Sequence, residues 1–170
     1  MTAPDAPTRA NVKRAIAAGD LAAIRRYTVE FGPAALQLGD DPDELTALHY
    51  AAAAGHEDLV MYLLAPPVNA DAGAVRGNRF TPLHCAAMNG HSKVCATLIK
   101  VGANVNAQTD PQGYAPLHTA AFTGHVEAIR VLLAGGADRT LRNHRNETPA
   151  DTAARTGQNE ARELLCGTGP

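Results

Sequence analysis

The chain has 170 residues, and 45% of them are hydrophobic, which is enough to build a packed core within a single domain. Aromatic residues make up only 4% and tryptophan is absent, so we expect a core of Ala, Leu, Val and Ile side chains that lets helices approach closely. The formal net charge of -2 gives no bulk attraction to nucleic acid or to an anionic membrane.

The charge is unevenly distributed. Residues 1–75 carry five basic and ten acidic side chains, whereas residues 76–170 carry ten and seven. An elongated molecule would therefore be acidic at one end and basic at the other. This asymmetry could orient a partner during encounter, or it could be ordinary solvated surface charge.

Three cysteines, Cys85, Cys95 and Cys166, show no CxxC spacing. An odd number without that spacing argues against both a disulfide framework and a zinc site. We therefore expect a reducing environment, in the cytoplasm and/or nucleus. No apolar run at the N-terminus resembles a secretory signal, and no stretch has the length of a membrane span.

The first predicted elements are two helices within residues 11–31. Ala15 and Ile16 precede a turn at Gly19-Asp20, and Ile24 lies in the second helix. This pair is a degenerate version of the pattern that follows.

From residue 46 one pattern returns at intervals of 35, 34 and 33 residues. Its copies are TALHYAAAAGH (46–56), TPLHCAAMNGH (81–91), APLHTAAFTGH (115–125) and the weaker TPADTAARTGQ (148–158). Such self-similarity indicates a repeat architecture.

Each position of the pattern has a structural cause. Thr accepts a hydrogen bond from an unpaired amide at a helix start, and Pro suits the first helical turn. Glycine then ends the helix in a left-handed conformation, and a second helix follows with apolar residues at helical spacing. Ala115 lacks the capping hydroxyl, which should weaken that helix start by about 1 kcal/mol.

These motifs are similar to the ankyrin repeat. The resemblance implies an all-α ankyrin solenoid of about five stacked helix-turn-helix units with projecting β-hairpin-like loops, and 1–170 form a single domain. The expected units are a degenerate N-terminal repeat (8–39), three repeats (40–75, 76–108 and 109–141) and a C-terminal capping repeat (142–166). Because such helices are too short to be stable alone, each unit should be held by its neighbours.

Two loops depart from the pattern. Ala65-Pro66-Pro67 replaces the expected glycine turn, and the loop 65–80 is long. It could be a specificity element or a tolerated insertion. The loop Asp110-Pro111-Gln112-Gly113 adds one residue.

Six of the seven histidines occupy two repeating positions, and the resemblance implies that they bond groups within and between units. No cysteine or carboxylate cluster completes a metal shell. A His84–Cys85 dyad is disfavoured because neighbours on a helix point about 100° apart. We therefore expect no catalytic residue, no metal and no cofactor.

The resemblance also implies a concave groove, lined by the loop residues before the Thr-Pro pair and the first-helix residues before the glycine. Large apolar groups on such a surface are typical of interface anchors, although Phe80 and Tyr114 could instead pack against the adjacent loop. The predicted partner-binding residues are Asp43, Leu45, Asn78, Phe80, Met88, Asn89, Gln112, Tyr114, Phe122, Thr123, Arg145 and Arg155.

The sequence thus favours a monomeric protein-interaction module or regulatory adaptor that binds another protein, and not nucleic acid or a membrane. Three alternatives stay open: an ankyrin-type kinase inhibitor, a substrate of an asparagine hydroxylase at Asn106, and an enzyme with an unrecognised site.

Overall fold

The computed structural model describes residues 7–36, 38, 45–66, 68 and 79–167. In these ranges the chain forms ten α-helices and one short 3-10 helix, with no extended strand. The helices are α1 (Arg9–Ala17), α2 (Leu21–Phe31), α3 (Ala47–Ala54), α4 (Glu57–Leu64), α5 (Pro82–Met88), α6 (Ser92–Lys100), α7 (Pro116–Thr123), α8 (Val126–Ala134), α9 (Pro149–Arg155) and α10 (Asn159–Cys166).

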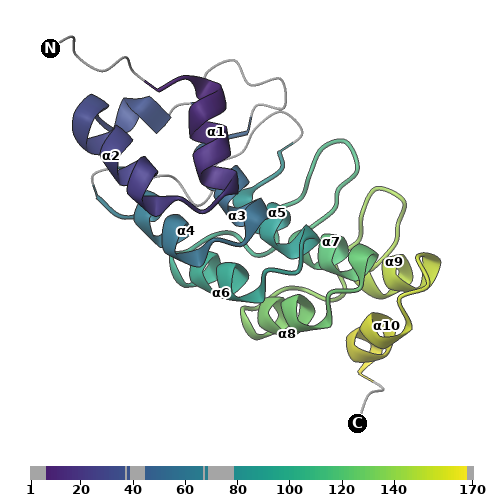
Figure 1. The fold of residues 1–170 in the computed structure, drawn as a ribbon. Coiled ribbons are helices and arrows are strands. Elements are labelled where there is room, and N and C mark those ends of the chain that lie inside the picture. The colour runs from purple at the N-terminus through teal and green to yellow at the C-terminus, as the bar shows by residue number, and fades with distance from the viewer. Residues whose placement is uncertain (1–6, 37, 39–44, 67, 69–78, 168–170) are drawn as a thin grey trace, which may run out of the picture.

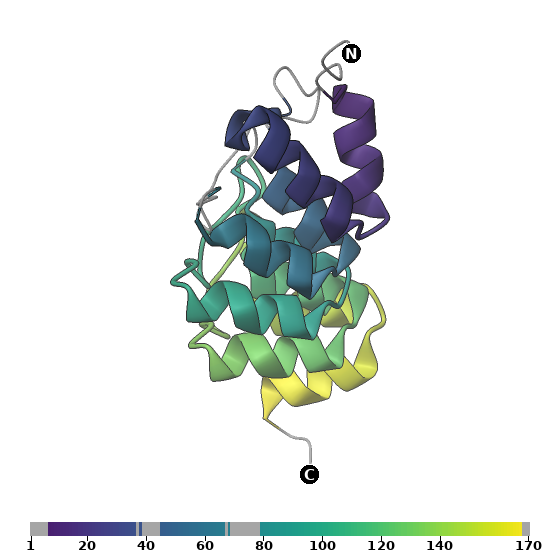
Figure 2. The same cartoon turned by 60° about the vertical axis from the view of Figure 1, so that its left-hand side comes forward.

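The helices form five pairs that stack in chain order along one axis (Figure 1). The first helices of the pairs, α1, α3, α5, α7 and α9, make one layer, and the second helices make the other. Figure 2 shows the second-helix layer in order from α2 at one end to α10 at the other. The two described loops that join α6 to α7 and α8 to α9 project to the same side of the stack (Figure 1). The predicted all-α ankyrin solenoid is confirmed.

The first helices begin and end where the repeat pattern predicts. Thr46, Thr81 and Thr148 each occupy the N-cap position in extended conformation. At the other end, Gly55 and Gly124 have φ angles of 78° and provide the left-handed cap. These caps satisfy backbone groups that a helix of only seven or eight residues would otherwise leave unpaired.

The core runs through the stack between the two layers. Both alanines of each pair on α3, α5 and α7 are fully buried, as are the leucines one turn earlier and the apolar face of the second helices, whereas on α9 Ala153 is buried and Ala154 is exposed. Small side chains at the contact let neighbouring first helices approach closely, as the composition predicted. The buried alanines are Ala51, Ala52, Ala86, Ala87, Ala120, Ala121 and Ala153.

The two ends differ in how they close the stack. At the N-terminal end α1 and α2 bury Val12, Ile16 and Ile24. A 3-10 helix at Pro33–Leu36, which the sequence pattern did not predict, follows α2 and buries Leu36. At the C-terminal end α10 buries Leu165 against the stack and turns charged residues outward.

Part of the sequence-based prediction lies outside the described residues. This applies to Asp43, Asn78 and most of the long loop 65–80.

Candidate functional site

The fully buried histidines His49, His84 and His118 link each repeat to the next. Their Nε2 atoms lie 3.0, 2.9 and 3.1 Å from the carbonyl oxygens of Phe80, Tyr114 and Glu147, respectively. Each carbonyl belongs to the loop residue immediately before the next helix cap. The histidines therefore fix the loop of the following repeat against the first helix of the preceding one.

The other ring nitrogen of each histidine faces its own helix start. The backbone amides of Thr46, Thr81 and Ala115 each donate to Nδ1 at 3.2 Å. Because Nδ1 accepts, the proton must be on Nε2, which donates it to the carbonyl. Both nitrogens of each ring are thus engaged in holding the fold.

Burial favours the uncharged form of His84 and His118. Desolvation lowers the pKa of His84 from 6.5 to about 4, although its bond to the Tyr114 carbonyl acts in the opposite direction. Burial also lowers the pKa of His118. At neutral pH the neutral tautomer matches the hydrogen bonds described above.

A second set of histidines points toward the preceding repeat. His56 Nε2 donates to the Ala17 carbonyl at 3.0 Å, and His91 Nε2 donates to the Ala53 carbonyl at 2.9 Å. These rings cover the glycine turns, so a Cβ at Gly90 would lie 2.7 Å from the His125 ring. Each of these turns must be glycine for steric as well as conformational reasons.

The two sets of histidines hold neighbouring repeats in both directions, and the surface they support is the first-helix face. We define the first-helix face as the exposed residues before each glycine turn on α3, α5, α7 and α9, together with the loop residues preceding those helices. Its shape depends on side-chain bonds rather than on a β-sheet.

The last two loops are closed by a buried side chain at matching positions. Thr109 N donates to the Tyr114 carbonyl at 2.9 Å, and Thr109 Oγ1 accepts from the Tyr114 amide at 3.0 Å. In the next loop Asn143 Oδ1 accepts from the amides of Arg145 and Glu147 at 2.9 and 3.0 Å. These bonds make each loop a compact turn with a fixed tip.

The loop tips also bond to one another. Gln108 Nε2 donates to the carbonyls of Gly113 and Arg142 at 2.8 and 2.9 Å. His144 N donates to the Gln112 carbonyl at 3.0 Å, and the His144 side chain bonds the Pro111 carbonyl. The tips of these two loops are therefore joined by hydrogen bonds.

A polar and aromatic cluster joins the last loop to α9 and α7. Arg155 Nε lies 2.9 Å from Glu147 Oε1, and Arg155 Nη2 lies 3.3 Å from the Tyr114 hydroxyl. The guanidinium carbon of Arg155 is 5.9 Å from the centre of the Phe122 ring, a cation–π distance. Residues from two successive units thus meet on the first-helix face.

A family model for ankyrin repeats, in three copies, matches residues 13–109 and 101–170. The chain belongs to the ankyrin-repeat family. Ankyrin repeats are generally protein-interaction modules, and the family is typically non-enzymatic.

Two curated proteins share part of this ankyrin array. Alpha-latrotoxin-Lh1a from Latrodectus hasselti is 37% identical over 70 residues, which are 41% of this chain and 5% of that protein. Diacylglycerol kinase zeta from Rattus norvegicus is 40% identical over 75 residues, which are 43% of this chain and 8% of that protein. The chain therefore matches only a small part of either relative.

The predicted partner-binding residues divide into exposed and half-buried groups. Phe122 is 47% exposed and Met88 is 40% exposed, at corresponding positions of the ankyrin repeats on α7 and α5. Gln112, Arg145 and Arg155 are exposed as well. Their side chains are therefore accessible to solvent.

Other predicted residues are committed to the ankyrin stack itself. Phe80 and Tyr114 are half-buried, with their rings 4.9 and 5.9 Å from the rings of His84 and His118. These ring contacts are with the helix that follows each residue, whereas the alternative left open by the sequence was packing against the adjacent loop. Leu45 is half-buried too.

Asn89 and Thr123 complete their own helices. Asn89 Nδ2 donates to the Cys85 carbonyl at 2.9 Å, and Thr123 Oγ1 donates to the Thr119 carbonyl at 3.0 Å. Whether any of these residues contacts a partner stays a prediction.

Sequence reasoning missed the residues that shape the loop tips. Asn143 and Thr109 are buried, and Glu147 receives bonds from both Asn143 and Arg155. The sequence carried a signal for the first two residues, because Thr109 and Asn143 align with each other once the extra residue in Asp110–Gly113 is allowed for. Glu147 occupies the loop position held by Phe80 and Tyr114 in the preceding repeats.

The cysteines next to the helix contacts are poor nucleophiles. Burial raises the pKa of the Cys85 and Cys95 thiols to about 12, so both stay protonated at neutral pH. His84 cannot activate Cys85, because both of its ring nitrogens are engaged elsewhere.

Within the described ranges, no three histidine, cysteine or carboxylate side chains gather in an arrangement that could hold a metal ion. Among the helices in those ranges, none has both the length and the apolar character needed to cross a membrane.

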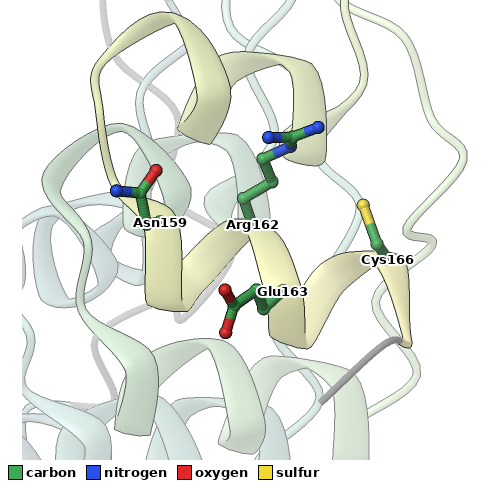
Figure 3. A pocket seen from close by; sticks show the side chains of 4 residues that line it. All are labelled: Asn159, Arg162, Glu163 and Cys166. Atoms are coloured by element: carbon green, nitrogen blue, oxygen red, sulfur yellow. The ribbon is translucent and has the colours of Figure 1, made fainter.

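An open hollow of about 270 Å³ lies on the last ankyrin unit. Figure 3 shows the side chains that line it, Asn159, Arg162, Glu163 and Cys166, all from α10. None of them belongs to the predicted partner-binding set. The hollow is a feature of one helix surface and not of the first-helix face.

Asn106 lies between two ankyrin loops. Asn106 Oδ1 accepts from the Asp138 amide at 2.9 Å, and Asn106 Nδ2 donates to the Gly136 carbonyl at 3.4 Å. Its side chain therefore joins the ends of the α6–α7 and α8–α9 loops near α6 and α8.

Proposed function

We propose that this ankyrin array is an adaptor that binds a partner protein across its first-helix face, with Phe122 and Met88 as the apolar anchors. The observation that supports the proposal is the exposure of these two large side chains at corresponding positions on neighbouring first helices. Large apolar groups of this kind contribute about 1.5–3 kcal/mol each when fully buried by a partner. They are also among the residue types enriched in interface cores.

The rigidity of the face supports the same proposal. The buried histidines fix the loops, and Asn143 and Thr109 fix the loop tips. A surface that is already ordered loses little conformational entropy when a partner docks. Repeat proteins of this kind use extended surfaces for recognition.

The test is recovery of partners from a cell lysate by the wild-type chain and by a double variant, Met88→Glu with Phe122→Glu. Both side chains are exposed, so we expect an unchanged helical circular dichroism spectrum and loss of most partners identified by mass spectrometry. Phe80 is left unchanged because it packs against His84 and the core.

Met61→Glu is the matched control. Met61 is 55% exposed and lies on α4 in the second-helix layer. We expect this variant to keep the wild-type partners. Equal recovery by all three proteins would show that the first-helix face is not the binding surface.

The remaining alternatives are more specific and have less support. Inhibition of a kinase would be one outcome of partner binding, and only the identity of the captured partner can decide it. Hydroxylation of Asn106 would add the mass of one oxygen to its peptide, and an unmodified peptide from native cells would remove that alternative.

A further inference from the structure

The charges around Phe122 indicate what kind of protein segment the first-helix face accepts. Phe122 is flanked by Arg155, whose guanidinium lies over its ring. Arg155 also bonds Glu147, and the positive charge of Arg145 acts on the same carboxylate. One carboxylate thus interacts with two arginines, which leaves a net positive charge on this side of the exposed aromatic ring.

Glu147 is firmly ionised and committed to internal bonds. The Asn143 side chain donates to Glu147 Oε2 at 3.0 Å and is the main cause that lowers the pKa of Glu147, with Arg155 and Arg145 contributing further. Its charge therefore offsets only one of the two arginines at neutral pH.

Two further carboxylates, Asp138 and Asp151, accept hydrogen bonds from their own loops. Asp138 Oδ1 accepts from the amide and hydroxyl of Thr140 at 2.8 and 2.6 Å. Asp151 Oδ2 accepts from the amide and hydroxyl of Thr148 at 2.9 and 2.8 Å, which caps α9. Neither carboxylate is oriented as a partner for a docked cation.

The arginines of the last loop are held outward by the backbone. The amide of Arg145 donates to Asn143 Oδ1, and Arg142 Nη1 donates to the Asn146 carbonyl at 2.6 Å. Both side chains are exposed. The cationic groups that the contacts connect to the Phe122 side are therefore Arg155, which lies over the ring, and Arg145, which interacts with the same Glu147 carboxylate.

From this arrangement we infer that the partner segment is acidic and carries a large apolar side chain next to its carboxylates. The inference rests on the proposed function above. The apolar side chain covers Phe122 and Met88, and the carboxylates lie against Arg145 and Arg155. Arginine is suited to this role because its planar guanidinium binds a carboxylate through two parallel hydrogen bonds.

A basic or neutral segment would be a poorer occupant. It would place a positive charge against Arg145, or bury the arginines without a compensating charge, and both arrangements cost binding free energy. The apolar anchors distinguish this surface from a simple anion site, because a nucleic-acid backbone would leave Met88 and Phe122 exposed.

The experiment is selection of twelve-residue peptides from a random display library against the full chain, followed by affinity measurement with synthetic peptides. We expect enrichment of Asp or Glu beside Phe, Leu, Met or Trp. Arg145→Glu should weaken binding of a selected peptide roughly tenfold or more, because a like charge replaces an attractive one.

Arg130→Glu is the control for a general charge effect. Arg130 is exposed on α8 in the second-helix layer, 3.6 Å from Glu127. The Arg130→Glu substitution makes the same change in net charge as Arg145→Glu, but away from the first-helix face. Peptide affinity should therefore stay within about twofold of wild type. Circular dichroism and the thermal midpoint check that both variants are folded.

The outcomes separate this inference from the proposed function. Two results overturn the inference and leave the proposed function standing, provided that the selected peptides lose binding to Phe122→Glu. In the first, the peptides contain no enriched acidic residues. In the second, Arg145→Glu does not affect their binding. Peptides unaffected by either change contradict both. Failure to select any peptide above background, or displacement of the peptide by a twelve-nucleotide single-stranded DNA at equal concentration, also overturns the inference.

Discussion

Each buried histidine makes one bond within its repeat and one to the next. His84 illustrates this, with Thr81 on one side of the ring and the Tyr114 carbonyl on the other. In the last unit Asp151 takes the place of histidine and caps α9 through Thr148. A carboxylate has no proton to donate forward at neutral pH, which fits a position with no described repeat beyond it.

The buried state of His84 predicts that stability depends on pH. An unfolded histidine binds a proton below about pH 6.5, whereas His84 in the fold does so only near pH 4. Between these values the unfolded state binds more protons, so the free energy of unfolding falls as the pH is lowered. The loss approaches about 3 kcal/mol for this group near pH 4 and then levels off.

Urea denaturation at pH 7 and pH 4.5 measures this effect, with His84→Gln as the comparison. The variant should lose less stability between the two pH values than the wild type, since His118 still contributes but His84 does not. If both proteins showed the same pH dependence, His84 would not be the group responsible.

Several single residues could be predicted from the repeat spacing and others could not. The six histidines and the glycine turns follow directly from the pattern. The half-burial of Phe80 does not, because it depends on His49 drawing the Phe80 carbonyl into the junction between α3 and α5. Such a contact joins two repeats, so it cannot be read from one copy of the pattern.

At the scale of single elements, helix starts decide how well each short helix forms. In α5 the Thr81 hydroxyl lies 2.8 Å from His84 Nδ1 and 3.4 Å from its amide. In α7 the N-cap is Ala115, so only its backbone amide bonds His118. The sequence-based expectation of a weaker start at α7 agrees with this geometry.

Ala115→Thr should therefore stabilise the protein by about 1 kcal/mol. Thr81 is almost fully buried at the equivalent position, which indicates that the repeat has room for the side chain. Ala115→Val is the matched control, because valine has the same shape without the hydroxyl. Chemical denaturation should show a gain for threonine alone, and an equal change in both variants would contradict the capping explanation.

The loops are the elements that sequence reasoning predicted least well. Their lengths differ by single residues, so Thr109 and Asn143 align only after the extra residue in Asp110–Gly113 is allowed for, and both then close their turns. The same register places Arg79, Gly113 and Asn146 at one shared loop position, each with positive φ, at 60°, 71° and 61°. Short-range patterns do not fix such a register because the bonds run between loop ends.

At the scale of the whole molecule, the stack makes the surface. The helices have seven to eleven residues, which is too short for stability in isolation. Burial of the alanine faces and the two sets of histidine hydrogen bonds supply the stability that each helix lacks in isolation. The first helices α1, α3, α5, α7 and α9 lie in one layer (Figure 1), so the residues at corresponding positions on neighbouring first helices face the same side.

The location of binding is the claim on which the functional proposal depends. Backbone amide chemical shifts, recorded by NMR while a selected acidic peptide is added to the full chain, would map it residue by residue. We expect the largest changes at Met88, Phe122, Arg145 and Arg155, and none at Met61 or Arg130. Changes confined to α4, α6 and α8 would contradict the assignment of the first-helix face.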